Sequence, residues 1–307
     1  MKTVLITAIG GDIGQSIAQC IRNYSDDVFL IGTDIHIKHG GSLFVDKVVI
    51  VPYANDPKYL DRISEIVNEN DIDVIIPVNE NELDVFANTD QNHSLIYCGK
   101  KIVNIGLDKL KTIECLKSLE IEVPWTIDAD ISDPIEFPCI IKPRFSSGSN
   151  LIFVVNSISE SNLFSAKYPK GVFQEFLDKY EKEITCALYR TKDGRIASIQ
   201  FERLLVGGLT GWAKVVNNKD VENLLFIIAD GLNLFGSINV QLRITDKGPM
   251  IFEINPRFSS TVFMRHKLGF TDVIWSINEF FGEQFQLTKA NLGNIVIRKQ
   301  DIELLPE

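Results

Sequence analysis

Residues 239–257 carry amide and carboxylate side chains at strand spacing on both sides of the turn-forming Asp246-Lys247-Gly248. A three-residue loop at that turn pairs Gln241 with Glu253 across a hairpin. Because side chains alternate between the two faces of a strand, Asn255 shares the face of Glu253, and Gln241 contributes to the same face. Mg²⁺ takes oxygen ligands and completes its octahedron with water and substrate phosphates. The segment therefore predicts a magnesium site formed by these three side chains.

A solvated edge strand is the alternative explanation of this polar face. The apolar residues Phe252 and Ile254 alternate with Glu253 and Asn255. Alternation of this kind is expected for both interpretations, since it puts the apolar side chains on the opposite face. The pattern by itself leaves both open.

The composition limits which class of protein, and which kind of ligand, such a site can belong to. The 307 residues are 45% hydrophobic and 23% charged, which is typical of a soluble globular protein of two or three domains. Five scattered cysteines favour neither a disulfide framework nor a zinc site, so we expect a reducing cytoplasm. No apolar run approaches the roughly 20 residues of a membrane helix. The net charge of −10 opposes nucleic-acid binding, and small molecules become the expected partners.

The elements that must position the site change character along the chain. The first hundred residues alternate short apolar runs with amphipathic stretches, which predicts a parallel sheet covered by helices on both faces. Asp108 is a plausible helix N-cap, and Pro124 lies beyond the end of that helix. The remainder is mostly strands joined by hairpin-like turns, with one helix over residues 220–234, which predicts an antiparallel α+β architecture.

The sequence Glu253-Ile-Asn-Pro-Arg257, with a glutamine on the preceding strand, is similar to the metal-binding signature of the ATP-grasp superfamily. It resembles most the branch that contains the synthetase domains of carbamoyl-phosphate synthase, and the resemblance covers nearly the whole chain. It implies a pre-ATP-grasp α/β domain over residues 1–108. It further implies a linker helix and small ATP-grasp subdomain with a phosphate loop over 109–177, and a large subdomain with the metal site over 178–307.

The same resemblance implies residues that contact the nucleotide phosphates. Lys142 takes the place of the lysine that contacts the α- and β-phosphates, and it ends the run Phe137-Pro-Cys-Ile-Ile-Lys142. The loop that folds over the phosphates corresponds to Ser147, Gly148 and Ser149. This loop departs from the family pattern because relatives often have several glycines there. Lys109 resembles a basic residue that approaches the nucleotide, although a solvated lysine in the first turn of a helix explains it equally well.

The adenosine contacts are also implied by the resemblance. Glu175 and, through its backbone, Leu177 correspond to the hinge strand that reads adenine. Glu183 matches the glutamate that accepts hydrogen bonds from the ribose hydroxyls, and Glu181 is the competing choice if the alignment slips by one strand period.

The substrate side is less defined by the sequence. Arg203 and Arg257 are the expected catalytic residues, because a planar guanidinium is suited to clamp a carboxylate or the transferring phosphoryl group. Asn79 and Glu80 follow a strand at its carboxyl end, where open α/β sheets contact ligands. Helix capping explains this pair equally well. The four histidines show no ligand spacing, and we expect them to be structural or exposed.

The activity implied by the resemblance is that of an ADP-forming carboxylate–amine ligase. It needs ATP and Mg²⁺, with Mn²⁺ as a possible substitute, and a carboxylate and an amine as substrates. Activation gives an acyl phosphate, which the amine attacks with release of phosphate. Neither a membrane nor a nucleic acid is an expected partner, and homo-oligomer formation stays open.

Two other functions compete with this hypothesis. Ile9-Gly-Gly-Asp-Ile-Gly14 and Asp34, about 20 residues beyond, imitate the dinucleotide fingerprint and would suit an NAD(P)-dependent oxidoreductase or epimerase. However, Ile9 stands where that pattern has its first glycine, and such an enzyme would not explain the metal cluster. The other alternative is a non-catalytic ATP-binding protein that keeps the fold without turnover.

Overall fold

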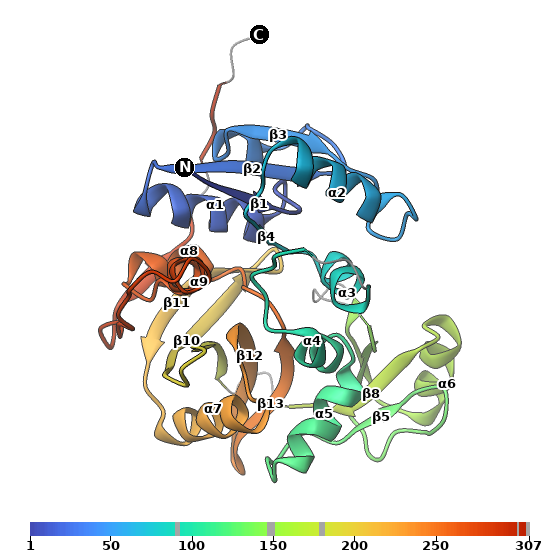
Figure 1. The fold of residues 1–307 in the computed structure, drawn as a ribbon. Coiled ribbons are helices and arrows are strands. Elements are labelled where there is room, and N and C mark those ends of the chain that lie inside the picture. The colour runs from blue at the N-terminus through green and yellow to red at the C-terminus, as the bar shows by residue number, and fades with distance from the viewer. Residues whose placement is uncertain (90–92, 146–150, 178–181, 300, 305–307) are drawn as a thin grey trace.

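The computed structural model describes residues 1–89, 93–145, 151–177, 182–299 and 301–304. Three sheets organise this part of the chain, and Figure 1 shows the parallel one stacked above the two antiparallel ones. The predicted order, an α/β domain followed by a two-part antiparallel fold, is confirmed. Among the described residues, no helix combines the length and apolar character needed to cross a membrane.

The amino-terminal sheet is wholly parallel and has the strand order β3-β2-β1-β4. Its strands are β1 (Lys2–Ile6), β2 (Val28–Asp34), β3 (Lys47–Ile50) and β4 (Val74–Ile76). Helix α1 (Asp12–Tyr24) packs on one face and α2 (Tyr59–Glu69) on the other, each through its own apolar core. The strand order reverses between β1 and β4, and ligands bind outside the carboxyl ends of strands at such a point. A short 3-10 helix, η1 (Gly40–Leu43), follows β2.

Three helices connect this sheet to the rest of the molecule: α3 (Glu80–Asn88), α4 (Lys100–Gly106) and α5 (Lys109–Ser118). Asn79 caps α3 in a capping box with Glu82, and Asp108 caps α5 by accepting a hydrogen bond from Leu110 N. The predicted helix after Asp108 is therefore confirmed, together with its cap.

The smaller antiparallel sheet has the order β5-β8-β6-β7. Its strands are β5 (Thr126–Asp128), β6 (Cys139–Pro143), β7 (Phe153–Val155) and β8 (Gly171–Glu175), and α6 (Ile158–Lys167) lies against it. Phe153, Phe173 and their neighbours form a small core of their own. This unit lies at the lower right of Figure 1.

The larger sheet has six strands in the order β13-β12-β9-β10-β11-β14, all antiparallel. Its strands are β9 (Glu183–Arg190), β10 (Ile196–Val206), β11 (Leu209–Val216), β12 (Gly236–Thr245), β13 (Gly248–Asn255) and β14 (Ile295–Ile297). One face packs on α7 (Lys219–Gly231), α4 and α5. The other face is covered at one end by α8 (Val262–Lys267) and α9 (Asp272–Phe280). The remaining end of that face carries the polar residues of the site.

The hairpin β12–β13 confirms the predicted pairing of Gln241 with Glu253, but its turn differs from the prediction. Thr245 pairs with Gly248, so the loop has two residues rather than three, and a register shift next to Gln241 leaves Phe252 without a partner. This β-bulge compensates for the shorter loop. The prediction that Phe252 and Ile254 share the apolar face is correct for Ile254, which lies in the core. It is wrong for Phe252, because the bulge turns that ring to within 5.6 Å of Lys142 Nζ.

Candidate active site

Two buried lysines from different elements face the same carboxylate. Lys142 lies on β6 and is 5% exposed, and Lys109 opens α5 and is 8% exposed. Burial lowers the pKa of Lys142 to about 8; the charge of Glu253 opposes this shift and that of Lys109 adds to it. Burial likewise lowers the pKa of Lys109, against the charges of Glu253, Glu80 and Asp108. Such a cluster holds desolvated positive charge, which suits the phosphates of a nucleotide.

An ion pair that sequence reasoning missed joins the two elements that carry these lysines. Arg144, directly after β6, donates to both carboxylate oxygens of Asp108 at 2.8 Å. It also donates to Asp128 at 3.1 Å. Burial on its own would raise the pKa of Asp108, but the hydrogen bonds and charge of Arg144 outweigh it and lower the pKa. This bidentate pair fixes the start of α5 against β6 and so holds the two lysines near each other.

The metal-ligand candidates lie together on β12 and β13. Gln241 pairs with Glu253, and Asn255 pairs with Asn239 one step further along the hairpin. Asn255 is 6% exposed. The buried Asn239 Nδ2 has no hydrogen-bond partner among the described residues, while its Oδ1 accepts a bond from Thr185. One carboxylate and two amide oxygens next to buried lysines form a donor set that fits Mg²⁺ with bound phosphates.

Glu183 and Arg203 are bonded to each other. The Arg203 guanidinium donates to Glu183 Oε1 at 2.9 and 2.6 Å and to Gln241 Oε1 at 3.1 Å. Arg243 donates to Glu183 Oε2 at 3.3 Å. Glu183 is the residue predicted for the ribose, and Arg203 is one of the two predicted for a carboxylate or the transferring phosphoryl group. The structure brings these two side chains into direct contact.

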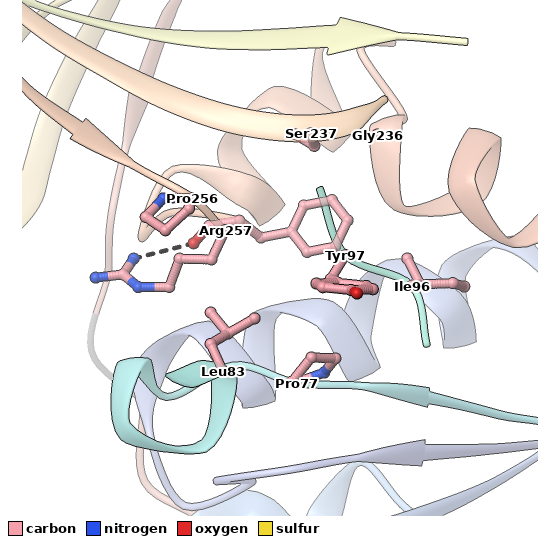
Figure 2. A pocket seen from close by; sticks show the side chains of 9 residues that line it. Pro77, Leu83, Ile96, Tyr97, Gly236, Ser237, Pro256 and Arg257 are labelled. Carbon is pink, nitrogen blue, oxygen red and sulfur yellow. Dashed lines mark hydrogen bonds between the residues drawn. The ribbon is translucent and has the colours of Figure 1, made fainter. Parts of the chain in front are cut away.

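Arg257 joins the β12–β13 hairpin to the amino-terminal domain. It donates to Glu80 Oε1 at 2.8 Å and to the carbonyl oxygen of Phe258 at 3.0 Å. The second bond is dashed in Figure 2. Beside it lies a cavity of about 10 Å³, which has room for about one water molecule and not for a substrate. Its lining residues are Pro77, Leu83, Ile96, Tyr97, Gly236, Ser237, Pro256, Arg257 and Phe258.

A buried ion pair supports the loop that carries Arg257. The side chain of Arg265, 0% exposed, makes two hydrogen bonds to Asp272 at 2.9 and 2.7 Å. It also donates to Ser259 and Thr261 at 3.0 and 3.1 Å. These bonds satisfy the guanidinium and fix the chain between β13 and α8, a role that no spacing in the sequence indicated.

The candidate adenine contacts lie at the end of β8. Glu175 accepts a hydrogen bond from Trp125 N at 3.3 Å and lies 3.9 Å from Lys247 Nζ, at the turn of the β12–β13 hairpin. Leu177 is half-buried just beyond the strand. The predicted phosphate-loop residues Ser147, Gly148 and Ser149 lie outside the described residues, as does Glu181.

The glycine-rich turn after β1 uses its polar groups internally. Asp34 Oδ2 accepts a hydrogen bond from Gly10 N at 2.8 Å, so the residue that would read a ribose is bonded to the loop itself. Asp34, His36 and His39 place ligand atoms within 4.8 Å of one another, contrary to the expectation that no histidines share ligand spacing. However, His39 Nδ1 accepts a hydrogen bond from Gly41 N at 3.1 Å, so this nitrogen is used within the turn and is not available to a metal.

Comparison with known proteins identifies both halves of the chain. Residues 107–261 match the family model described as the ATP-grasp domain, and residues 4–97 match that of the PylC-like N-terminal domain. An uncharacterised protein of Methanocaldococcus jannaschii is 24% identical over 216 residues, which are 66% of this chain and 54% of that protein. The chain thus spans about half the length of this relative.

Three solved structures share the fold at low sequence identity. The ADP complex of N5-carboxyaminoimidazole synthetase from Staphylococcus aureus has a TM-score of 0.76 at 17% identity, covering 96% of this chain and 80% of that one. L-amino acid ligase from Bacillus licheniformis gives 0.75 at 15%, covering 91% and 74%. The biotin carboxylase domain of Hydrogenobacter thermophilus 2-oxoglutarate carboxylase, in complex with MgADP and bicarbonate, gives 0.74 at 16%, covering 96% and 73%.

Proposed function

The chain belongs to the ATP-grasp family, and from that premise we propose that it is a Mg²⁺-dependent ligase. It activates a carboxylate as an acyl phosphate and transfers the acyl group to an amine, with release of ADP and phosphate. The observation that carries the proposal is the meeting of the buried Lys109 and Lys142 with Glu253, beside Gln241 and Asn255. The lysines can bind phosphates, and the three oxygen-bearing side chains can bind a metal ion. Phosphoryl transfer requires both kinds of group close together.

The proposed nucleotide site runs between the two antiparallel sheets. Lys142 would bind the α- and β-phosphates, and Lys109 would approach the nucleotide. The resemblance assigns Ser147, Gly148 and Ser149 to the phosphate loop. Glu175 and the Leu177 backbone bind adenine. The small subdomain over 109–177 and the large one over 178–307 would then enclose the nucleotide.

The proposed reaction centre lies on β12, β13 and β10. Gln241, Glu253 and Asn255 would hold Mg²⁺, which when bound neutralises charge on the phosphates during transfer. Arg203 and Arg257 orient the attacking carboxylate and the transferred phosphoryl group. Glu183 accepts bonds from the ribose hydroxyls, which requires it to exchange some of its bonds to Arg203 and Arg243 for bonds to ligand.

Hydroxylamine trapping tests the reaction class. The protein is incubated with ATP, Mg²⁺, hydroxylamine and each member of a panel of carboxylates, including the amino acids. We expect one or more carboxylates to give hydroxamate and ADP in equal amounts, because an acyl phosphate forms only by cleavage between the β- and γ-phosphates. AMP and pyrophosphate as products would identify an adenylating enzyme. ATP binding without turnover on any carboxylate would favour a non-catalytic protein.

A further inference from the structure

Among the described residues, the side chain to which Arg257 donates a hydrogen bond is Glu80 of the amino-terminal domain. Glu80 opens α3, at the carboxyl edge of the parallel sheet and next to the point where the strand order reverses. Helix capping does not explain it, because Asn79 and Glu82 form the capping box of α3. The Glu80 carboxylate is therefore directed to the reaction centre and not to its own helix.

The charge balance of this pair changes when substrates bind. The side chains of Arg257 and Glu80 are only 12% and 15% exposed. In the proposed reaction, Arg257 pairs with an anionic carboxylate or phosphoryl group. Its positive charge then no longer compensates the carboxylate of Glu80. A largely buried carboxylate that loses its partner is costly, so a substrate that brings a replacement cation is favoured. The charge of Lys109 also interacts with Glu80. In the proposed function, however, Lys109 pairs with the nucleotide and cannot replace Arg257.

The second substrate of the proposed reaction is such a cation. An aliphatic amine has a pKa of about 10.4 and reaches the site as an ammonium ion. It must lose a proton before its nitrogen can attack the acyl carbon, and a carboxylate within hydrogen-bond reach is suited to accept that proton.

We propose that Glu80 binds the ammonium group of the amine substrate and accepts its proton, an inference that rests on the proposed function. One N–H bond breaks and its proton passes to Glu80. The freed nitrogen lone pair forms the N–C bond to the acyl carbon, and the C–O bond to phosphate breaks, with its electron pair leaving on phosphate. The nitrogen then releases its second proton to solvent. The substrate class is a primary aliphatic amine, including amino acids, and not a neutral or anionic acceptor, which the carboxylate would disfavour.

Two nucleophiles of different charge separate this role from a structural one. Hydroxylamine is mostly uncharged at neutral pH and needs no base to expose its lone pair, whereas an amino acid amine is protonated. Wild type and Glu80→Gln are compared on a carboxylate that gives hydroxamate, first with hydroxylamine and then with a mixture of amino acids as amines. We expect the ratio of amine-dependent to hydroxylamine-dependent turnover to fall about 100-fold in the variant.

Two further measurements complete the test. The amine-dependent rate of Glu80→Gln should recover as pH rises, because free amine becomes available without a base. Asp84→Asn, the same chemical change at an exposed position of α3, should leave the ratio as in wild type. Calorimetric binding of Mg-ADP establishes that Glu80→Gln is folded.

The outcomes are distinguishable. Equal losses with both nucleophiles, at every pH, would show that Glu80 acts only by holding Arg257 and would overturn the inference while leaving the ligase proposal intact. Absence of hydroxamate with every carboxylate in wild type would overturn the ligase proposal, and this inference with it.

Discussion

The β12–β13 hairpin and the glycine-rich turn after β1 both look like nucleotide sites in the sequence, but the structure uses them differently. In the turn, Gly10 N donates a hydrogen bond to Asp34. Gly14 lies in the first turn of α1, where a Cβ would be 2.6 Å from the carbonyl oxygen of Ala8. Its glycines serve close packing of the chain. In the hairpin, Glu253 instead faces two buried lysines from other elements. The turn therefore spends its polar groups on its own conformation, whereas the hairpin brings a carboxylate opposite cations from other elements.

Replacing the hairpin carboxylate should produce the largest effect. We expect Glu253→Gln to lower turnover at millimolar Mg²⁺ by about 100-fold or more, because it removes charge that a metal needs during phosphoryl transfer. Nucleotide affinity should change less, and Asn255→Ala should act in the same direction. The measurement is ADP release over a Mg²⁺ titration. Wild-type rates in both variants would show that the hairpin is a solvated edge.

Loss of the buried lysine should affect nucleotide binding. A charge-assisted hydrogen bond contributes about 1.5–3 kcal/mol, so Lys142→Ala should weaken ATP binding roughly 10- to 150-fold. Calorimetry measures the affinity. Lys111→Ala, at an exposed position of α5, is the control and should bind as wild type does. Unchanged affinity in a folded Lys142→Ala protein would remove Lys142 from the site.

The same lysine should also lower the stability of the ligand-free protein. Its pKa falls from 10.5 to about 8 on folding, so the unfolded chain binds more protons between those values. Stability should therefore rise with pH through that window, and the cost of the buried charge is fully present below it. Lys142→Met should raise the free energy of unfolding at neutral pH by about 2–3 kcal/mol. Urea unfolding measures it, with Lys111→Met as the control; a decrease would show that the charge is well compensated.

The smallest effect is expected in the glycine-rich turn. Asp34→Asn keeps the size of the side chain but weakens its bond from Gly10 N, so it should cost about 1 kcal/mol of stability. Turnover and ATP affinity should stay within about twofold of wild type. A tenfold loss of either would mean that the turn serves the nucleotide after all, and the contrast with the hairpin would fail.

Strand periodicity was sufficient to predict which side chains of the hairpin share a face, and the signature that includes Arg257 gave the family. Periodicity did not reveal the bulge at Phe252. A two-residue loop with one unpaired residue gives the same pairing of Gln241 with Glu253 as a three-residue loop without a bulge. The bonds of Arg203 to Glu183 and of Arg257 to Glu80 were also missed. Both depend on which strands and domains become neighbours, and no local pattern encodes that.

The fate of the substrate's own oxygen tests the central claim most directly. A carboxylate that supports turnover is prepared with heavy oxygen in both positions and incubated with ATP, Mg²⁺ and an amine. Attack of the carboxylate on the γ-phosphate followed by amine attack on the acyl carbon must leave one labelled oxygen in the released inorganic phosphate. The account predicts one labelled oxygen per phosphate, detected by mass spectrometry. Label found in AMP, or phosphate released without label, would contradict it.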